Sequence, residues 1–354
     1  MINVGFWSFY EEGCYNNLRF TNPDVGPQEN CSRKYNDLYI IGKRMGVNFI
    51  TLDLISDFDK TNGFLFADFP RMKNKLVQKA FSSGKPLFLI LEEAEVIYPV
   101  NWKLDNHRFF DKIFTWNDIL VDNVKYFKFN VHYIETKQIN KDLNRKEKLC
   151  TLIASNKSSS HPLQLYSKRR EIIRWFEKNH PDDFDLYGRE WDMYPFPADR
   201  KWIGRLNSRK LRFLRKFFKQ YYPSWRGEID RKKSVLGKYK FVIAFDNARD
   251  IPGYILEKIF DFTAGIVPVY WGANNVTDHI PDNCFIDKRK FDNYEDLYNF
   301  MKVMSDEKYL GYLENIEKFL NSEKSYQFSS EYFADTVIGE VKKTIQQKNH
   351  SRNR

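Results

Sequence analysis

Short apolar runs alternate with segments of helical periodicity through the N-terminal part of the chain. The apolar runs are rich in Ile, Val, Leu and Phe, which is typical of buried strands. They lie at 2–9, 48–54, 86–91, 113–116 and 125–129, and helical spacing is found at 35–46 and 72–81. This alternation predicts a parallel-sheet α/β domain, which we place at 1–140.

The same alternation resumes after a polar, charged segment at 134–148, which we interpret as an interdomain linker. Apolar runs return at 149–154, 184–187, 241–245 and 266–271, and helical patterns at 166–178, 254–264, 294–304 and 307–319. A second domain is therefore predicted at 149–320. Residues 321–354 are predicted to form a C-terminal helix and a basic tail, disordered from Lys342 onward.

The stretch 240–272 is the one around which the second domain is organised. A strand ending at Phe245 leads into the polar turn 246–250, and a helical pattern then runs to Gly265, where a helix C-cap is expected. A second strand follows. Strand, loop, helix and strand form one βαβ unit, and ligands of such folds gather at the C-terminal edge of the strands.

The first turn of that predicted helix carries the candidate chemistry. Tyr254 and Lys258 are four residues apart and would share one helix face. An ammonium and a phenol beside a helix N-terminus make a site for phosphate or diphosphate that needs no metal. Glu257 suits a pair of sugar hydroxyls. The alternative is an ordinary solvated Glu–Lys pair.

This stretch resembles the nucleotide-sugar motif of the α-1,3-fucosyltransferases, glycosyltransferase family ten, in two ways: a run F-x-x-x-F-E-N-x-x-x-x-G-Y-[IV]-T-E-K-[IL], and then G-x-[IV]-P-[IV]-x-x-G. The chain departs from the motif at Asp246, which replaces a Glu, and at Leu256, which replaces a Thr. The matching residues are Phe241, Phe245, Asn247, Gly253, Tyr254, Glu257, Lys258, Ile259, Gly265, Val267, Pro268, Val269 and Gly272.

The resemblance implies an α/β fold of GT-B architecture, with two Rossmann-like domains facing across a cleft. Residues 1–140 would then bind the acceptor and 149–320 the GDP-sugar. The implied reaction is inverting transfer of L-fucose from GDP-β-L-fucose to an acceptor glycan, α-1,3 to N-acetylglucosamine, in glycan biosynthesis or protein glycosylation. The exchange at Leu256 leaves a different GDP-sugar open, and the acceptor is not determined.

On the donor side, the resemblance assigns the diphosphate to Arg169, Tyr254 and Lys258, with Arg170 as the alternative arginine. Glu257 would hold the ribose. Asn247 would order the loop or touch the sugar, and Asp246 keeps the charge of the family's Glu with a shorter reach.

On the acceptor side, the segment LEEAEVIYPVNW resembles the family's acceptor domain, in which a Glu after this strand is the general base. That register selects Glu93, with Glu95 as the alternative. From the residues alone, these carboxylates are equally a solvated acidic turn.

The net charge of +10 allows three kinds of partner: an anionic substrate such as a sugar nucleotide, an anionic membrane surface, or nucleic acid. The excess lies mainly in 199–240 and in 342–354. The first segment includes a basic amphipathic pattern around 211–221. A helix there would lie on a membrane or, as we prefer, pack its apolar stripe on the protein.

Four widely spaced cysteines, Cys14, Cys31, Cys150 and Cys284, indicate free thiols of a reducing compartment. No long apolar run indicates a membrane anchor, and the first residues do not read as a signal peptide. We expect a cytoplasmic protein, membrane-associated at most through its basic segments at the inner face of a membrane.

Two other functions compete with the fucosyltransferase. A metal-dependent glycosyltransferase uses an Asp-x-Asp pair, and the sequence has Asp57-Phe58-Asp59 and Asp183-Phe184-Asp185. A nucleic-acid-binding protein would use the basic segment, although no recognised motif accompanies it. We expect no required cofactor, with GDP-fucose as donor substrate, Mn²⁺ or Mg²⁺ stimulatory at most, an oligosaccharide as acceptor, and no nucleic-acid partner.

Overall fold

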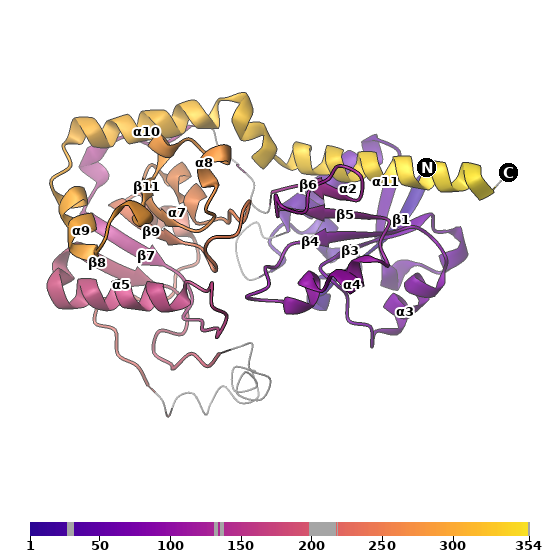
Figure 1. The fold of residues 1–354 in the computed structure, drawn as a ribbon, viewed down its shortest axis with the longest axis horizontal. Helices are drawn as coiled ribbons and strands as arrows, with labels where there is room; N and C mark the ends of the chain where they lie inside the picture. Colours follow the sequence, from indigo (N-terminus) through magenta and orange to yellow (C-terminus); the bar gives the residue numbers. More distant parts are fainter. Residues whose placement is uncertain (27–31, 131–133, 135–137, 198–216, 218, 353–354) are drawn as a thin grey trace. The chain divides into compact units, whose positions relative to one another are not determined.

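The computed structural model describes every residue except 27–31, 131–133, 135–137, 198–216, 218 and 353–354. The chain forms two compact units (Figure 1). The first unit contains residues 1–133 and 326–354, and the second contains 134–325. The predicted helix around 211–221 falls mostly outside the described residues.

The first unit is built on a six-stranded sheet in the order β2-β1-β3-β4-β5-β6, and each neighbouring pair is parallel. Its strands are β1 (Ile2–Ser8), β2 (Val47–Thr51), β3 (Gly63–Ala67), β4 (Leu87–Leu91), β5 (Lys112–Thr115) and β6 (Tyr126–Lys128). All residues of β3 and β4 are buried, as expected for strands covered on both faces. The predicted strands are confirmed, and β3 is an addition to them.

Helices cover this sheet. The α-helices are α1 (Leu18–Thr21), α2 (Arg33–Arg44), α3 (Lys75–Ser82), α4 (Leu104–His107) and α11 (Ser330–Arg352). Short 3₁₀ turns are η1 (Glu11–Gly13), η2 (Leu52–Leu54), η3 (Phe58–Lys60) and η4 (Pro99–Trp102). The turn η11 (Glu323–Phe328) brings the chain back from the second unit.

The C-terminal tail was predicted wrongly as disordered. The helix α11 continues to Arg352 and packs along α2 (Figure 1). Val341 and Ile345 are buried, and Lys342 Nζ donates a hydrogen bond to the carbonyl of Met45 (2.8 Å). The polar composition conceals a narrow apolar stripe at helical spacing, which is sufficient to bury one side of the helix.

The second unit has a five-stranded parallel sheet in the order β11-β10-β9-β7-β8. Its strands are β7 (Lys148–Ile153), β8 (Phe184–Tyr187), β9 (Tyr239–Phe245), β10 (Val267–Trp271) and β11 (Ile286–Asp287). Its helices are α5 (Tyr166–Asn179), α7 (Lys232–Leu236), α8 (Val276–His279), α9 (Tyr294–Lys302) and α10 (Asp306–Leu320). Its 3₁₀ turns are η5 (Leu143–Arg145), η6 (Pro181–Asp183), η8 (Ile259–Ala264), η9 (Asp282–Cys284) and η10 (Lys288–Lys290).

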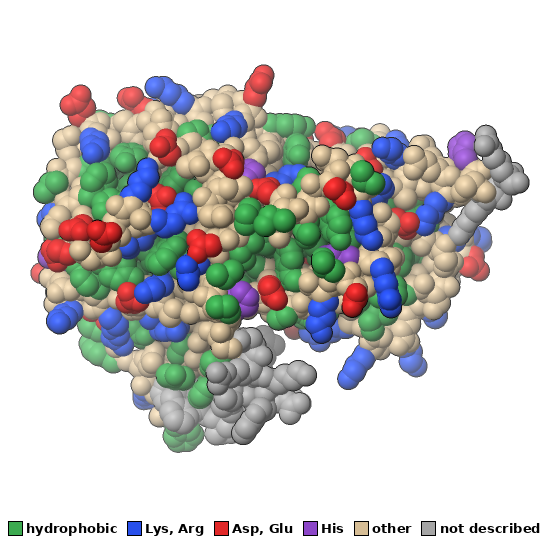
Figure 2. Space-filling model, viewed as in Figure 1, with side chains coloured by type: hydrophobic (Ala, Val, Ile, Leu, Met, Phe, Trp, Pro, Cys, Tyr) green, Lys and Arg blue, Asp and Glu red, His purple; other side chains and the backbone are tan. Residues whose placement is uncertain are grey.

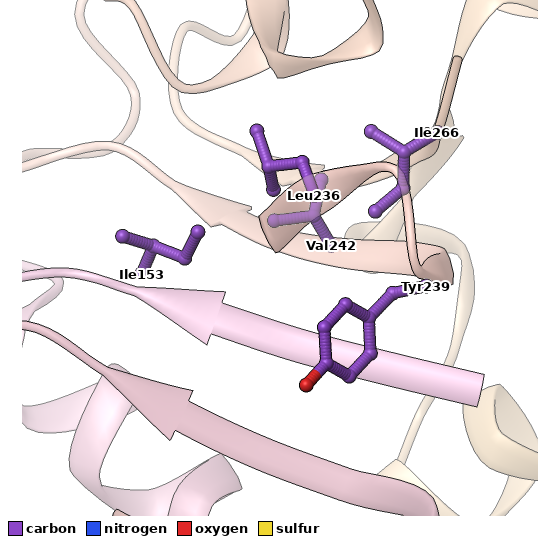
Figure 3. Close-up of a cluster of buried hydrophobic side chains, with 5 residues drawn as sticks. All are labelled: Ile153, Leu236, Tyr239, Val242 and Ile266. Atoms are coloured by element: carbon purple, nitrogen blue, oxygen red, sulfur yellow. The ribbon is translucent and has the colours of Figure 1, made fainter. Parts of the chain in front are cut away.

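One face of this sheet packs against α7 through a small hydrophobic cluster (Figure 3). The cluster joins Ile153 at the end of β7 to Tyr239 and Val242 of β9, with Leu236 and Ile266 against them. The cluster therefore runs from the start of β9 to the end of β7 and fixes α7 against this face of the sheet.

The predicted α-helix at 254–264 is wrong in its first half. Only Ile259–Ala264 is helical, as the 3₁₀ turn η8, although Gly265 does cap it in the left-handed region (φ 71°). Tyr254, Ile255 and Leu256 are consecutive buried residues, a pattern that an amphipathic helix does not produce. Tyr254 and Lys258 therefore do not share the first turn of an α-helix.

Surface charge is mixed on the face drawn in Figure 2, where Lys and Arg side chains alternate with Asp and Glu. No helix among the described residues is both long and apolar enough to span a bilayer. The three cysteines that the structure describes, Cys14, Cys150 and Cys284, are buried free thiols, as predicted.

Candidate functional site

Arg169 reaches from the first turn of α5 to the C-terminal end of β9. Its Nε and Nη2 donate to the carbonyl of Phe245 (3.0 and 2.6 Å), and Nη2 also donates to Asn247 Oδ1 (3.1 Å). The side chain is only 4% exposed, and this burial lowers the pKa of Arg169. The arginine therefore holds Asn247 and the loop after β9 in place.

Lys258 reaches the C-terminal end of β7, the strand beside β9, much as Arg169 reaches the end of β9. Its Nζ donates to the carbonyl of Ile153, the last residue of β7 (3.2 Å), and the residue is 6% exposed. Burial lowers the pKa of Lys258 to about 7, and the nearby Arg169 and Lys232 act in the same direction. Two buried basic side chains thus lie at the ends of adjacent parallel strands.

Asp246 is the acidic member of this cluster and is fully buried. Its Oδ2 accepts hydrogen bonds from the Tyr270 hydroxyl (2.7 Å) and the backbone N–H of Leu256 (3.4 Å). Its Oδ1 has no hydrogen-bond partner among the described residues. Burial raises the pKa of Asp246 to about 7. A Cβ at Gly272 would come within 2.5 Å of Asp246 Oδ2, so the motif glycine is a steric requirement.

The remaining predicted donor residues lie close to this cluster. Tyr254 is buried and Glu257 is half-buried, and both interact electrostatically with Arg169. Arg170 leaves the helix in another direction and donates to the carbonyl of Lys157 (2.7 Å). The structure therefore brings Arg169, rather than Arg170, together with the other donor candidates, while the roles of all of them stay predictions.

In the first unit, the backbone that carries Glu93 is fixed from both sides. Asp68, the residue after β3, accepts the backbone N–H groups of Glu92 and Glu93 on its Oδ1 (2.8 and 3.0 Å). The indole N–H of Trp116 donates to the carbonyl of Glu92, and that of Trp102 to the carbonyl of Glu93 (3.0 Å each). Four hydrogen bonds therefore hold the backbone of Glu92 and Glu93.

The three acidic side chains of the loop lie in different surroundings. Glu92 forms an ion pair with Lys34 of α2. Glu93 Oε1 accepts a hydrogen bond from the hydroxyl of Tyr10 (2.7 Å). Glu95 is exposed. Of the two base candidates, Glu93 is the one that accepts the hydrogen bond from the hydroxyl of Tyr10, a residue just beyond the end of another strand.

Sequence reasoning missed Tyr10 and Asp68. Burial, together with the carboxylates of Glu92 and Glu93, raises the pKa of Asp68 to about 8. Asp68 also has a positive φ (58°), a strained conformation for a residue with a Cβ. Polar residues that directly follow adjacent parallel strands meet at one sheet edge, but this signal becomes visible only once the strand order is known.

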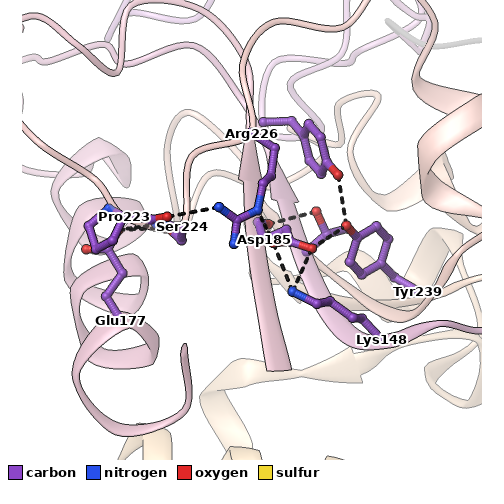
Figure 4. Close-up of polar contacts among 9 residues, drawn as sticks. Lys148, Glu177, Asp185, Pro223, Ser224, Arg226 and Tyr239 are labelled. Atoms are coloured by element: carbon purple, nitrogen blue, oxygen red, sulfur yellow. Dashed lines mark hydrogen bonds and ion pairs between the residues drawn. The ribbon is translucent and has the colours of Figure 1, made fainter. Parts of the chain in front are cut away.

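The Asp-x-Asp pairs have other partners. Asp57 caps its own 3₁₀ turn by accepting the N–H of Asp59 (2.9 Å). Asp183 pairs with Lys302 (2.8 Å) at the start of β8, away from the C-terminal sheet edge. Asp185 accepts from Arg226 (2.6 Å), Tyr239 (2.7 Å) and Lys148 (3.0 Å; Figure 4).

Sequence comparison places this geometry in a family. The model described as glycosyltransferase family 10 (fucosyltransferase) C-term matches residues 143–353. The chain belongs to this family. The match includes the whole cluster around Arg169 and Lys258, and the predicted resemblance is thereby confirmed.

Curated relatives match over a shorter segment. An α-(1,4)-fucosyltransferase of Arabidopsis thaliana is 35% identical over 79 residues, which are 22% of this chain and 20% of the relative. A GDP-fucose protein O-fucosyltransferase 3 of Xenopus laevis is 39% identical over 84 residues, 23% of this chain and 18% of the relative. The matches thus span about a fifth of these proteins.

Structural comparison confirms the fold class. A crystal structure of an α1,3-fucosyltransferase aligns with a TM-score of 0.55 over 98% of this chain and 90% of that one, at 13% identity. At this identity the likeness concerns the fold alone. The two parallel-sheet units are those of the GT-B class, as the sequence predicted.

Proposed function

We propose that this family 10 member is an inverting fucosyltransferase that moves L-fucose from GDP-β-L-fucose to a hydroxyl of an acceptor glycan. The observation that carries the proposal is the pair of buried basic side chains, Arg169 and Lys258, at the C-terminal ends of β9 and β7. Ligands of doubly wound sheets bind at this edge. We further propose N-acetylglucosamine O3 as acceptor, although the named relatives include proteins described by other linkages and acceptors.

On the donor side, Arg169 and Lys258 neutralise the departing diphosphate, and Tyr254 adds a phenol hydroxyl. Charge on the diphosphate grows as the sugar leaves, so these groups bind the transition state more strongly than the ground state. Glu257 holds the ribose. Asn247, already fixed by Arg169, orders the loop beside the sugar.

On the acceptor side, Glu93 is the general base. The acceptor oxygen forms a bond to the anomeric carbon while its proton passes to Glu93. The bond from that carbon to the diphosphate oxygen breaks, and its electron pair leaves with GDP. A single displacement of this kind inverts the anomeric centre from β to α.

Replacing Glu93 with Ala tests this assignment. Turnover should fall about 10²-fold or more, the usual contribution of a positioned base, while calorimetric GDP affinity stays unchanged. Glu95→Ala is the matched control and should retain activity. An active Glu93→Ala enzyme together with an inactive Glu95→Ala enzyme would move the role to Glu95.

Chelation tests the metal-dependent alternative. With organic cations on the diphosphate, transfer measured by mass spectrometry should survive EDTA. Complete loss on chelation, restored by Mn²⁺, would favour an Asp-x-Asp mechanism instead.

A further inference from the structure

Tyr10 lies where the chain leaves β1, two residues beyond its last residue, Ser8. Its backbone is anchored there, because its N–H donates to Ser8 Oγ (3.2 Å) and its carbonyl accepts from Arg19 Nη2 (3.4 Å). Its ring packs edge-on against Phe9, with 5.2 Å between the ring centroids. The hydroxyl therefore reaches Glu93 from a fixed origin.

The Tyr10 side chain is 44% exposed, yet its hydroxyl points to Glu93 Oε1 at 2.7 Å. The hydroxyl stays a donor at every pH of interest, because burial of its oxygen and the charge of Glu93 raise the pKa of Tyr10 far above its ordinary value. The two residues are 83 positions apart in the sequence, so the contact depends on the folded sheet edge.

We propose that Tyr10 is a positioning residue for Glu93: its hydroxyl sets the direction of the carboxylate and favours the ionised form that accepts a proton. The proposal rests on the proposed function, in which Glu93 is the base. Asp68 and Trp102 fix the backbone of Glu93 but do not determine where its carboxylate points. The hydrogen bond from Tyr10 acts on the carboxylate itself.

Charged groups of both signs lie at this sheet edge. A hydrogen bond donated to a carboxylate favours its ionised form. The titratable and charged groups around Glu93 come from several elements: Tyr10 and Arg19 before β2, Lys34 on α2, Asp68 and Arg71 after β3, and Glu92 and Glu95 on its own loop.

The test is Tyr10→Phe, which removes only the hydroxyl. The acid limb of the kcat/KM profile should move about one pH unit upward, since hydrogen bonds to charged groups have that magnitude. At the pH optimum kcat should fall about tenfold, while GDP affinity stays unchanged. Tyr15→Phe is the matched control: Tyr15 is 46% exposed and follows the same strand, and its variant should keep the wild-type profile.

A double-mutant cycle with Glu93→Ala separates this inference from the proposed function. If Tyr10 acts through Glu93, the double variant should be no slower than Glu93→Ala. An unshifted acid limb with kcat within twofold of wild type would overturn the role of Tyr10, as would a full additional loss in the double variant. An active Glu93→Ala enzyme would instead overturn the base assignment itself.

Discussion

The donor cluster predicts that GDP binds more tightly on the acid side of neutrality. Lys258 and Asp246 both have pKa values of about 7, because burial penalises the charged form of each. Below pH 7 the lysine is charged and the aspartate is neutral, and above pH 7 the lysine is neutral and the aspartate is charged. The cluster is therefore most positive below pH 7, which favours a diphosphate.

The magnitude follows from proton linkage. A bound diphosphate favours the ammonium, so it raises the pKa of Lys258 back toward the ordinary lysine range. At a pH between the pKa of Lys258 in the free protein and its pKa in the complex, binding takes up one proton. The affinity for GDP then falls about tenfold for each unit by which the pH rises. From pH 7 to pH 8.5 the uptake by Lys258 alone weakens GDP binding about 15-fold. Proton uptake by Asp246 would add to this loss.

Calorimetric titration with GDP from pH 6.5 to 8.5, at constant ionic strength, measures the effect. Two buffers of different ionisation enthalpy count the protons taken up. Above pH 7 the terminal phosphate of GDP is already ionised, since such a group has a pKa of about 6. Above pH 7 the change of GDP affinity with pH therefore reports proton uptake by the protein.

Lys258→Met should weaken binding and flatten the slope. Lys240→Met is the control, because Lys240 pairs with Asp306 in the same unit and should keep both. Affinity that is constant between pH 7 and 8.5, or a slope that survives in Lys258→Met, would show that Lys258 does not take up a proton when GDP binds.

Two further predictions concern packing. Ile345→Ala, on the buried side of α11, should lower the free energy of unfolding by about 2–5 kcal/mol and the melting midpoint of the first unit by roughly 5–15 °C. Gln346→Ala, on the exposed side, should leave the midpoint unchanged. Equal midpoints for the two variants would mean that α11 does not contribute to folding. Gly272→Ala should weaken GDP binding and destabilise the chain by about 1–3 kcal/mol, because the new methyl meets Asp246 Oδ2 and the Tyr270 hydroxyl. Gly311→Ala adds a methyl in open space and is the control. Equal GDP affinities and equal unfolding temperatures for the two variants would contradict the steric argument.

Strands were the part of the fold most readily predicted from the sequence, because a parallel sheet buries both faces and its strands are continuous apolar runs. The strand β3 was not predicted because its apolar run, Phe64–Ala67, is short and is followed at once by Asp68. The end of α11 was not predicted because its few buried positions lie among Lys, Gln and Asn residues.

The loop after β9 shows where periodicity fails. Ile255, Ile259 and Phe262 have helical spacing, and the sequence alone therefore favours a helix. In the fold, the backbone N–H of Leu256 turns to Asp246, ten residues earlier, and the regular pattern of helical hydrogen bonds does not start there. A long-range bond of this kind leaves no local signal.

Arg169 was predictable because helix phase decides between the two arginines. Ile172 and Ile173 are buried on α5, and Arg169 precedes them by three and four residues, which places it on the same side of the helix. Arg170 is rotated away from that side. Its contact with the carbonyl of Lys157 agrees with this phase.

Tyr10 and Asp68 could not be predicted without the strand order. Because β3 pairs with β1 on one side and with β4 on the other, the residues after these three strands become neighbours. Asp68 then lies between Tyr10 and Glu93, although each belongs to a distant part of the sequence. The second unit uses the same device, since Phe245 and Ile153 end adjacent strands and receive Arg169 and Lys258. In both units the candidate chemistry therefore depends on which strands are adjacent, and a family motif confined to one strand and loop describes only part of it.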